Sequence, residues 1–231
     1  MNLQMPQMPP KFLFWLLWLG LIVYSFLLAP PDYPDTFDLI QRLSTGQLAG
    51  INPLIAALFN LMGVLPLIYS CVLYADGRGQ RVRAFPFIFL SFFIGAFGLL
   101  PYLALRQANP IFTGPKNWVI RLFDSRWLGL LILLGVIALL SYGISQGDWA
   151  DFWQQWQTRR FIHVMSLDFC CLCALFPLLV GDDLARRGIQ GDRRLWLLAF
   201  IPLVGAAAYL VMRPPIQPIA TPESDPTPSL S

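Results

Sequence analysis

Charged side chains are scarce in this sequence. They make up 13% of the 231 residues, whereas hydrophobic residues make up 56% and aromatic residues 14%. Soluble domains carry about 25% charged residues, so this composition excludes an ordinary soluble domain and predicts an all-α, polytopic membrane protein. The net charge of +3 is small, and the basic residues lie in short loops between apolar runs. We therefore expect the lipid bilayer as a partner and no nucleic acid.

Residues that bind metals or act as nucleophiles are also few. The chain has one histidine, and it contains no H-E-x-x-H, no histidine box, no G-x-S-x-G and no G-x-x-x-x-G-K-[ST]. These absences argue against the common metalloprotease, desaturase, hydrolase and phosphate-loop sites and favour a protein that is not an enzyme, although they leave the question open. The four cysteines, at positions 71, 170, 171 and 173, fall in apolar segments and predict no secreted disulfide framework. The pair Cys170 and Cys173 is a lone C-x-x-C, which is a weak zinc signal, so we assign no metal ligands here.

Long apolar runs fill most of the chain. Six of them approach the 20 residues or so that a helix needs to cross a bilayer; they lie at residues 12–28, 52–74, 86–105, 127–144, 161–180 and 195–212. They predict a single transmembrane domain over residues 1–212. Residues 213–231 contain six prolines and no apolar period, which predicts a disordered tail. Pro30 follows the first run at a poor position for signal cleavage, so we expect that run to be retained.

Two polar segments between these runs have the features of membrane-surface helices. The run TFDLIQRLSTG, which begins at Thr36, places Phe37, Leu39 and Leu43 toward the membrane if it is helical. The run DWADFWQQWQTRR, from Asp148, sets three tryptophans among acids and amides. Indole rings settle at headgroup level, so this second run predicts an aromatic belt.

The chain shows signs of an internal duplication. The run LMGVLPLIYSCVLYADGRGQRVR resembles LCALFPLLVGDDLARRGIQGDRR, with Pro66 and Pro177 in corresponding places. With six spans, each half has three, and the halves are predicted to be inverted. Biased composition alone also produces such repeats. On this layout seven basic residues lie on the N-terminal side of the membrane and nine on the other, so orientation is undecided.

Asp168 is the carboxylate placed inside an otherwise apolar run. It is the eighth residue of the fifth span, roughly 12 Å from that end at about 1.5 Å per residue. A charge at that depth costs about 2.5 to 3.5 kcal/mol, so we expect Asp168 to face protein or water. Its expected partners are Asn60, Tyr69, Ser141 and Tyr142. Asp168 is the candidate catalytic or ligand-orienting acid; the alternative is a structural hydrogen bond between helices.

The same span carries the histidine. His163, Ser166, Cys170 and Cys173 lie within about 80° of one another on a helix, and Asp168 points about 140° away from His163. A metal or porphyrin bound through His163 is one hypothesis. The other is that His163, third in its span, contacts headgroups or water.

Four charged residues follow this span at the membrane edge, namely Asp182, Asp183, Arg186 and Arg187. Helical spacing pairs Asp182 with Arg186 and Asp183 with Arg187. Such clusters are usually solvated helix ends. The functional alternative is a pocket for a polar headgroup or a docking surface.

Short motifs in the C-terminal half resemble a known family. They are PKNW at Pro115 to Trp118, H-x-x-x-x-D at His163 and Asp168, and D-x-x-R-R-G at Asp183 to Gly188. They are similar to the abscisic-acid-deficient-4-like membrane proteins, which are required for neoxanthin formation. The N-terminal half, with INPLIAALFNLMGVLPLIY and LPYLALR, resembles uncharacterised membrane proteins of cyanobacteria and chloroplasts.

This resemblance implies a thylakoid or plasma membrane of a cyanobacterium-like cell. It implies a xanthophyll or another isoprenoid as ligand, with His163 and Asp168 as ligand-binding positions; Asn60 and Tyr142 join them as expected partners of Asp168. A carotenoid or chlorophyll is the cofactor to consider, although its identity stays open.

Three functions follow as hypotheses. The first is a non-catalytic protein of a photosynthetic membrane that binds pigment or lipid or assists the assembly of a complex. The second is a membrane-embedded enzyme or accessory factor of carotenoid or isoprenoid modification that uses Asp168. The third is a small secondary transporter built from inverted halves.

Overall fold

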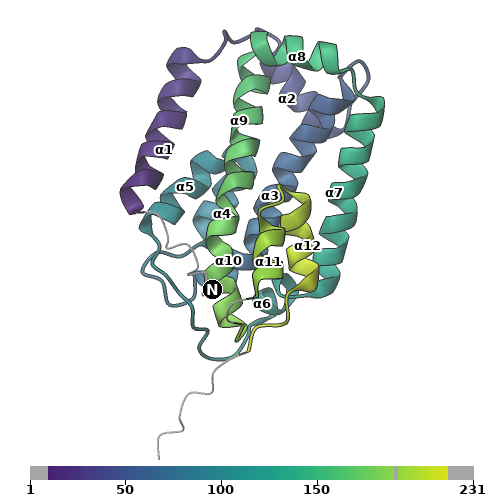
Figure 1. Ribbon diagram of the computed structural model, residues 1–231. Coiled ribbons are helices and arrows are strands. Elements are labelled where there is room, and N and C mark those ends of the chain that lie inside the picture. The colour runs from purple at the N-terminus through teal and green to yellow at the C-terminus, as the bar shows by residue number, and fades with distance from the viewer. Residues whose placement is uncertain (1–9, 190–191, 218–231) are drawn as a thin grey trace, which may run out of the picture.

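The structure is a computed structural model, and it describes residues 10–189 and 192–217. All regular elements in these residues are helices (Figure 1), so the expected all-α fold is confirmed. They are α1 (Lys11–Val23), a π-helical turn η1 (Tyr24–Leu28), α2 (Thr36–Thr45), α3 (Pro53–Asp76), α4 (Phe85–Ile94), α5 (Ala96–Leu105), α6 (Trp118–Phe123), α7 (Arg126–Gln146), α8 (Trp149–Thr158), α9 (Arg160–Leu175), α10 (Pro177–Arg186), α11 (Arg193–Ala199) and α12 (Val204–Met212).

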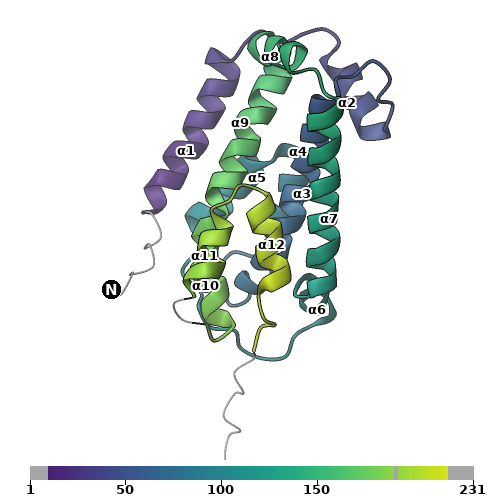
Figure 2. The same cartoon turned by 45° about the vertical axis from the view of Figure 1, so that its right-hand side comes forward.

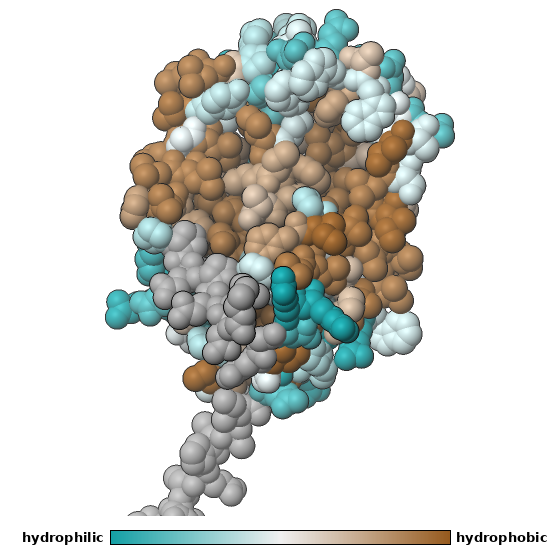
Figure 3. All heavy atoms as spheres, viewed as in Figure 1, coloured by the Kyte–Doolittle hydropathy of each residue, from teal (hydrophilic) through white to brown (hydrophobic). Residues whose placement is uncertain are grey.

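Four helical segments among the described residues are long and apolar enough to cross a membrane. They are Lys11–Leu28, Pro53–Asp76, Arg126–Gln146 and Arg160–Arg186. Hydrophobic side chains form a broad band across the middle of the molecule between two more polar ends (Figure 3). The protein is therefore a multi-pass membrane protein, as its composition predicts.

The third and sixth expected spans, 86–105 and 195–212, are not single helices. The first breaks at Gly95, where φ is +54°, and the second breaks before Leu203, where φ is +59°. Each positive φ reverses the chain, so that α4 with α5 and α11 with α12 form two helical hairpins. Such backbone breaks leave no periodic trace in a continuous apolar run, which explains why the sequence pattern predicts spans there.

Both hairpins close through a glycine placed just after the reversal. A Cβ on Gly98 would lie 2.8 Å from the backbone nitrogen of Ser91, and one on Gly205 would lie 1.9 Å from the carbonyl oxygen of Leu198. The two arms of each hairpin therefore pack backbone to backbone, and the chain enters and leaves the apolar layer at one end.

The two halves of the chain repeat one order of elements: a span, a surface helix, a second span and a hairpin. Asn52, at the start of α3, donates hydrogen bonds to the Asp148 carbonyl and to Asp151, close to the start of α9. Asp76, at the end of α3, lies 3.0 Å from Arg186 at the end of α10. The second span of the first half, α3, thus runs in the same direction as the second span of the other half, α9 with α10 (Figures 1 and 2). The expected inversion is absent because each half crosses twice rather than three times.

Both expected surface helices are present, and both lie at one end of the molecule (Figure 2). In α2, Leu43 packs into the protein while Phe37 is 77% exposed. In α8, Trp149 and Trp153 are exposed. We call this end the acidic end, because it also holds Asp32, Asp35, Asp38, Asp148 and Asp151.

The basic residues are divided very unequally between the two ends. Of the 16 lysines and arginines, only Arg42, Arg159 and Arg160 lie at the acidic end. The others lie at the opposite end, the basic end, where α3 and α10 finish and α6 lies, or at the start of α1, which points there. Six spans predict a nearly even count of seven and nine basic residues on the two sides, whereas the structure shows a strong asymmetry. The reason is that a hairpin returns to the side from which it entered, so the loops before and after it lie on the same side of the membrane.

The first residues of the expected disordered tail are ordered. Arg213 is 2% exposed and Ile216 is 3% exposed, and the Ile216 amide donates a hydrogen bond to Asp124 at 3.1 Å. A buried arginine and its acidic partners hold this segment, which a proline-rich composition does not predict. Residues 218–231 of that tail lie outside the described residues.

Candidate functional site

Asp168 lies at the reversal of the first hairpin. It is 5% exposed, and its Oδ1 accepts a hydrogen bond from the Ala96 amide at 2.7 Å, so that this carboxylate from α9 caps the first turn of α5. A Cβ on Gly95 would lie 1.8 Å from Asp168 Oδ2. The glycine is thus required both for its backbone conformation and for the space that the carboxylate fills.

None of the partners expected for Asp168 hydrogen-bonds to it in the part of the chain that the structure describes. Asn60 is exposed and donates to the Ala56 carbonyl of its own helix. Tyr142 is 38% exposed on the outer side of α7, where Ser141 is exposed as well. Tyr69 is buried but donates to the Leu172 carbonyl at 2.6 Å. The structure therefore does not gather His163, Asp168, Asn60 and Tyr142 into one ligand site.

His163 joins three elements near the acidic end. It is 6% exposed, its Nδ1 lies 2.9 Å from the Trp156 carbonyl, and its Nε2 lies 2.8 Å from the Tyr24 hydroxyl. A carbonyl can only accept, so Nδ1 carries the proton, and in the neutral ring Nε2 accepts from Tyr24. Both ring nitrogens are occupied, which leaves neither free for a metal. Among the described residues there is also no cluster of three or more histidine, cysteine or acidic side chains.

The four charged residues expected at a solvated helix end are largely buried. Asp183, Arg186 and Arg187 are at most 3% exposed, and the Asp182 side chain is 16% exposed. Asp183 pairs with Arg187 as predicted, at 2.9 Å. The predicted pairing of Asp182 with Arg186 is replaced: Asp182 binds Arg106 at 2.5 Å, and Arg186 binds Asp76 at 3.0 Å. The reason is that both hairpins bring further charged residues to this end.

In the first half, three residues form a buried triad. Asp76 accepts hydrogen bonds from the Tyr102 hydroxyl at 2.7 Å and from Arg106 at 2.8 and 2.5 Å. All three side chains are at most 1% exposed. This triad fastens the returning arm of the first hairpin to the end of α3.

The second half contains the same triad. Asp183 accepts from the Tyr209 hydroxyl at 2.6 Å and from Arg213 at 3.0 Å. In both halves the aspartate precedes its tyrosine by 26 residues and its arginine by 30. This correspondence supports an internal duplication whose register differs by about one helical turn from the alignment of Pro66 with Pro177.

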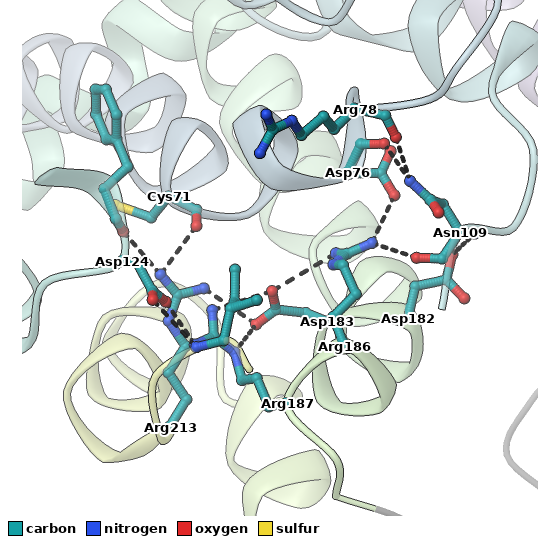
Figure 4. Close-up of polar contacts among 12 residues, drawn as sticks. Cys71, Asp76, Arg78, Asn109, Asp124, Asp182, Asp183, Arg186, Arg187 and Arg213 are labelled. Carbon is teal, nitrogen blue, oxygen red and sulfur yellow. Dashed lines mark hydrogen bonds and ion pairs between the residues drawn. The ribbon is translucent and has the colours of Figure 1, made fainter. Parts of the chain in front are cut away.

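Two arginines connect the triads to each other and to the rest of the basic end (Figure 4). Arg186 contacts both aspartates, with Nη1 3.0 Å from Asp76 and Nη2 3.5 Å from Asp183. Arg187 lies between Asp183 and Asp124, 2.6 Å from the latter, and it also donates to the Pro214 carbonyl. The result is one buried network, which we call the double-triad network.

The charges of this network stabilise one another. Burial alone lowers the pKa of the Arg187 guanidinium, but the carboxylates of Asp183 and Asp124 offset that effect and hold its pKa above the usual range. The pKa of Arg106 is raised in the same way, with Asp76 and Asp182 outweighing burial. These arginines therefore stay charged, and removing one partner would leave an uncompensated buried charge.

Five residues of the network are not among the site residues expected from the sequence, namely Asp76, Tyr102, Arg106, Tyr209 and Arg213. The signal that would have found them is the shared spacing D-x25-Y-x3-R, which occurs once in each half and ends directly after each hairpin. All four cysteines are free in the structure.

Comparisons with family models, with curated proteins and with solved structures gave no match for this chain.

Proposed function

We propose that this protein is a non-catalytic integral membrane protein of a photosynthetic membrane, and that it binds an isoprenoid pigment or lipid. The resemblance of its PKNW, H-x-x-x-x-D and D-x-x-R-R-G motifs to a family needed for xanthophyll formation supports the class of ligand. The observation that carries the proposal is a row of aromatic rings on α4.

The aromatic row consists of Phe85, Phe89 and Phe93. These residues are four apart and share one face of α4; successive ring centroids are 6.2 and 5.2 Å apart. The rings are 57%, 54% and 72% exposed, so they form the outer surface of the first hairpin. The first ring pair is stacked and the second meets edge to face. Exposed rings along one face of a helix offer an extended apolar contact, which suits a polyene or isoprenoid chain.

The polar candidates support a non-catalytic role. Asp168 caps α5, His163 joins α8, α9 and η1, and the double-triad network binds its own members. A general acid must be within hydrogen-bond reach of its substrate. In the described residues each of these groups is instead engaged in holding helices together.

The test is to purify the protein in a mild detergent from its native membrane and to identify bound molecules by absorption spectroscopy and by mass spectrometry of the extract. We expect a bound carotenoid or isoprenoid lipid, and we expect Phe89→Ala/Phe93→Ala to lose most of it. The matched control is Phe12→Ala/Phe26→Ala, since both phenylalanines are exposed on the first span. An empty wild-type protein, or equal loss in both variants, would count against the proposal. Copurification of a photosynthetic complex, with no pigment bound to this protein itself, would favour a role in assembly.

A transporter is the second candidate, and the two hairpins favour it. Interrupted helices at membrane depth occur where backbone is buried in protein or lines a pathway, and many transporters bind their substrate there. Asp168 lies at one such interruption. In sealed liposomes loaded with pyranine, a proton pathway through Asp168 predicts faster decay of an imposed pH gradient for the wild type than for Asp168→Asn. Decay at the rate of empty liposomes for both proteins would remove this candidate.

A further inference from the structure

Six exposed arginines surround the basic end. They are Arg81, Arg83, Arg121, Arg126, Arg193 and Arg194. The acids described at this end are buried or half-buried. The outermost layer is thus cationic, although four arginines lie paired beneath it in the double-triad network.

The same rim carries large aromatic side chains. Trp118 and Trp127 are 75% and 80% exposed, at the starts of α6 and α7. Arg121 and Arg126 lie close to them in sequence and are exposed as well. Tryptophan settles at the headgroup level of a bilayer, where arginine binds phosphate oxygens. The combination is therefore typical of a surface in contact with anionic headgroups.

The positions of these arginines recur in the two halves. Arg81 and Arg83 directly precede the first hairpin, and Arg193 and Arg194 begin the second. Both hairpins thus enter the apolar layer from a basic loop. The arginines at both entrances place positive charge where the chain enters the apolar layer, which fits a negatively charged lipid surface.

We infer that the basic end faces the cytoplasmic side of the membrane and binds the anionic lipid headgroups of that leaflet. Short loops rich in lysine and arginine stay on the cytoplasmic side during insertion. Only three of the 16 basic residues lie at the acidic end. Basic residues at the membrane edge are attracted to acidic lipids, by about fivefold in binding for each residue.

The orientation is tested by labelling single introduced cysteines with a membrane-impermeant maleimide. Ala108→Cys lies at the basic end and Gln157→Cys at the acidic end, and both positions are exposed. In sealed membrane vesicles with the cytoplasmic face outward we expect label on Ala108→Cys only, with Gln157→Cys labelled after permeabilisation. The unsubstituted chain, whose four cysteines lie in the spans, sets the background. Label on Gln157→Cys before permeabilisation would overturn the orientation.

The lipid partner is tested with spin-labelled phosphatidylglycerol and phosphatidylcholine in reconstituted membranes. We expect the wild type to prefer phosphatidylglycerol and Arg121→Gln/Arg126→Gln to lose several-fold of that preference. Arg42→Gln/Arg159→Gln, which removes two charges at the acidic end, should retain it. No preference in the wild type, or the same loss in both double variants, would overturn the headgroup assignment. Neither experiment depends on a bound isoprenoid.

Discussion

Asp76 and Asp183 belong to different halves of the chain and share one guanidinium. Arg186 Nη1 lies 3.0 Å from Asp76 Oδ1, and Arg186 Nη2 lies 3.5 Å from Asp183 Oδ1. Each aspartate also holds a tyrosine and an arginine from its own hairpin. Arg186 is therefore the side chain through which the two triads meet, and the ends of α3 and α10 are joined by charge as well as by apolar packing.

The first prediction concerns this shared arginine. Arg186→Gln should lower the free energy of unfolding by about 2 to 3 kcal/mol, because two buried carboxylates each lose a cationic neighbour but keep others. The measurement is unfolding in mild detergent, followed by circular dichroism. Arg42→Gln is the control, since its ion pair with Asp38 is 3.9 Å long and exposed, and it should change stability by less than about 0.5 kcal/mol. Equal effects would mean that the buried bridge adds nothing.

The second prediction follows from the repetition of the triad. Tyr102→Phe and Tyr209→Phe each remove one hydroxyl that donates to a buried carboxylate, at 2.7 and 2.6 Å. Each should lower the free energy of unfolding by about 1.5 to 3 kcal/mol, and the two losses should be similar. Tyr142→Phe, on the exposed side of α7, should be neutral in the same assay. A loss at only one tyrosine would show that the two triads are not equivalent.

Composition and apolar run length predict the helical membrane class, and the four spans of the structure correspond to expected runs. The two hairpins are not predicted, because reversal depends on a single backbone angle at Gly95 and at Leu203. A glycine or a proline within an apolar run is common in spanning helices as well. The relative orientation of the two halves depends on these reversals, so the apolar pattern does not predict it correctly either.

In the candidate site, too, the sequence predicts only the contacts that are local in the chain. The pair of Asp183 and Arg187 is local, and helical spacing predicts it. The bonds of Asp183 to Tyr209 and of Asp76 to Arg106 span 26 and 30 residues, so they depend on how the hairpins fold back. Asp168 is expected to face protein or water, and at 5% exposed it is buried in protein. Its partner is the Ala96 amide, which only the reversal at Gly95 exposes.

The third prediction tests that reversal. Gly95→Ala introduces a side chain at φ +54°, with its Cβ 1.8 Å from Asp168 Oδ2, so we expect a loss of at least about 3 kcal/mol in the free energy of unfolding. Gly135→Ala is the matched control, because nothing lies within 4 Å of its added Cβ and α7 is helical there. It should be neutral or stabilise by up to about 1 kcal/mol. Equal stability of the two variants would contradict the close contact.

The fourth prediction separates the two roles of Asp168. Asp168→Asn retains a side-chain oxygen for the Ala96 amide, so the variant should fold with nearly unchanged stability, whereas Asp168→Leu leaves that buried amide unpaired and should cost about 1 to 3 kcal/mol. If the carboxylate is structural, Asp168→Asn will also restore the pigment composition of a deletion strain, measured by chromatography of extracts. If instead Asp168→Asn folds normally and a pigment conversion is lost, the acid takes part in chemistry, and the enzyme hypothesis replaces the non-catalytic one.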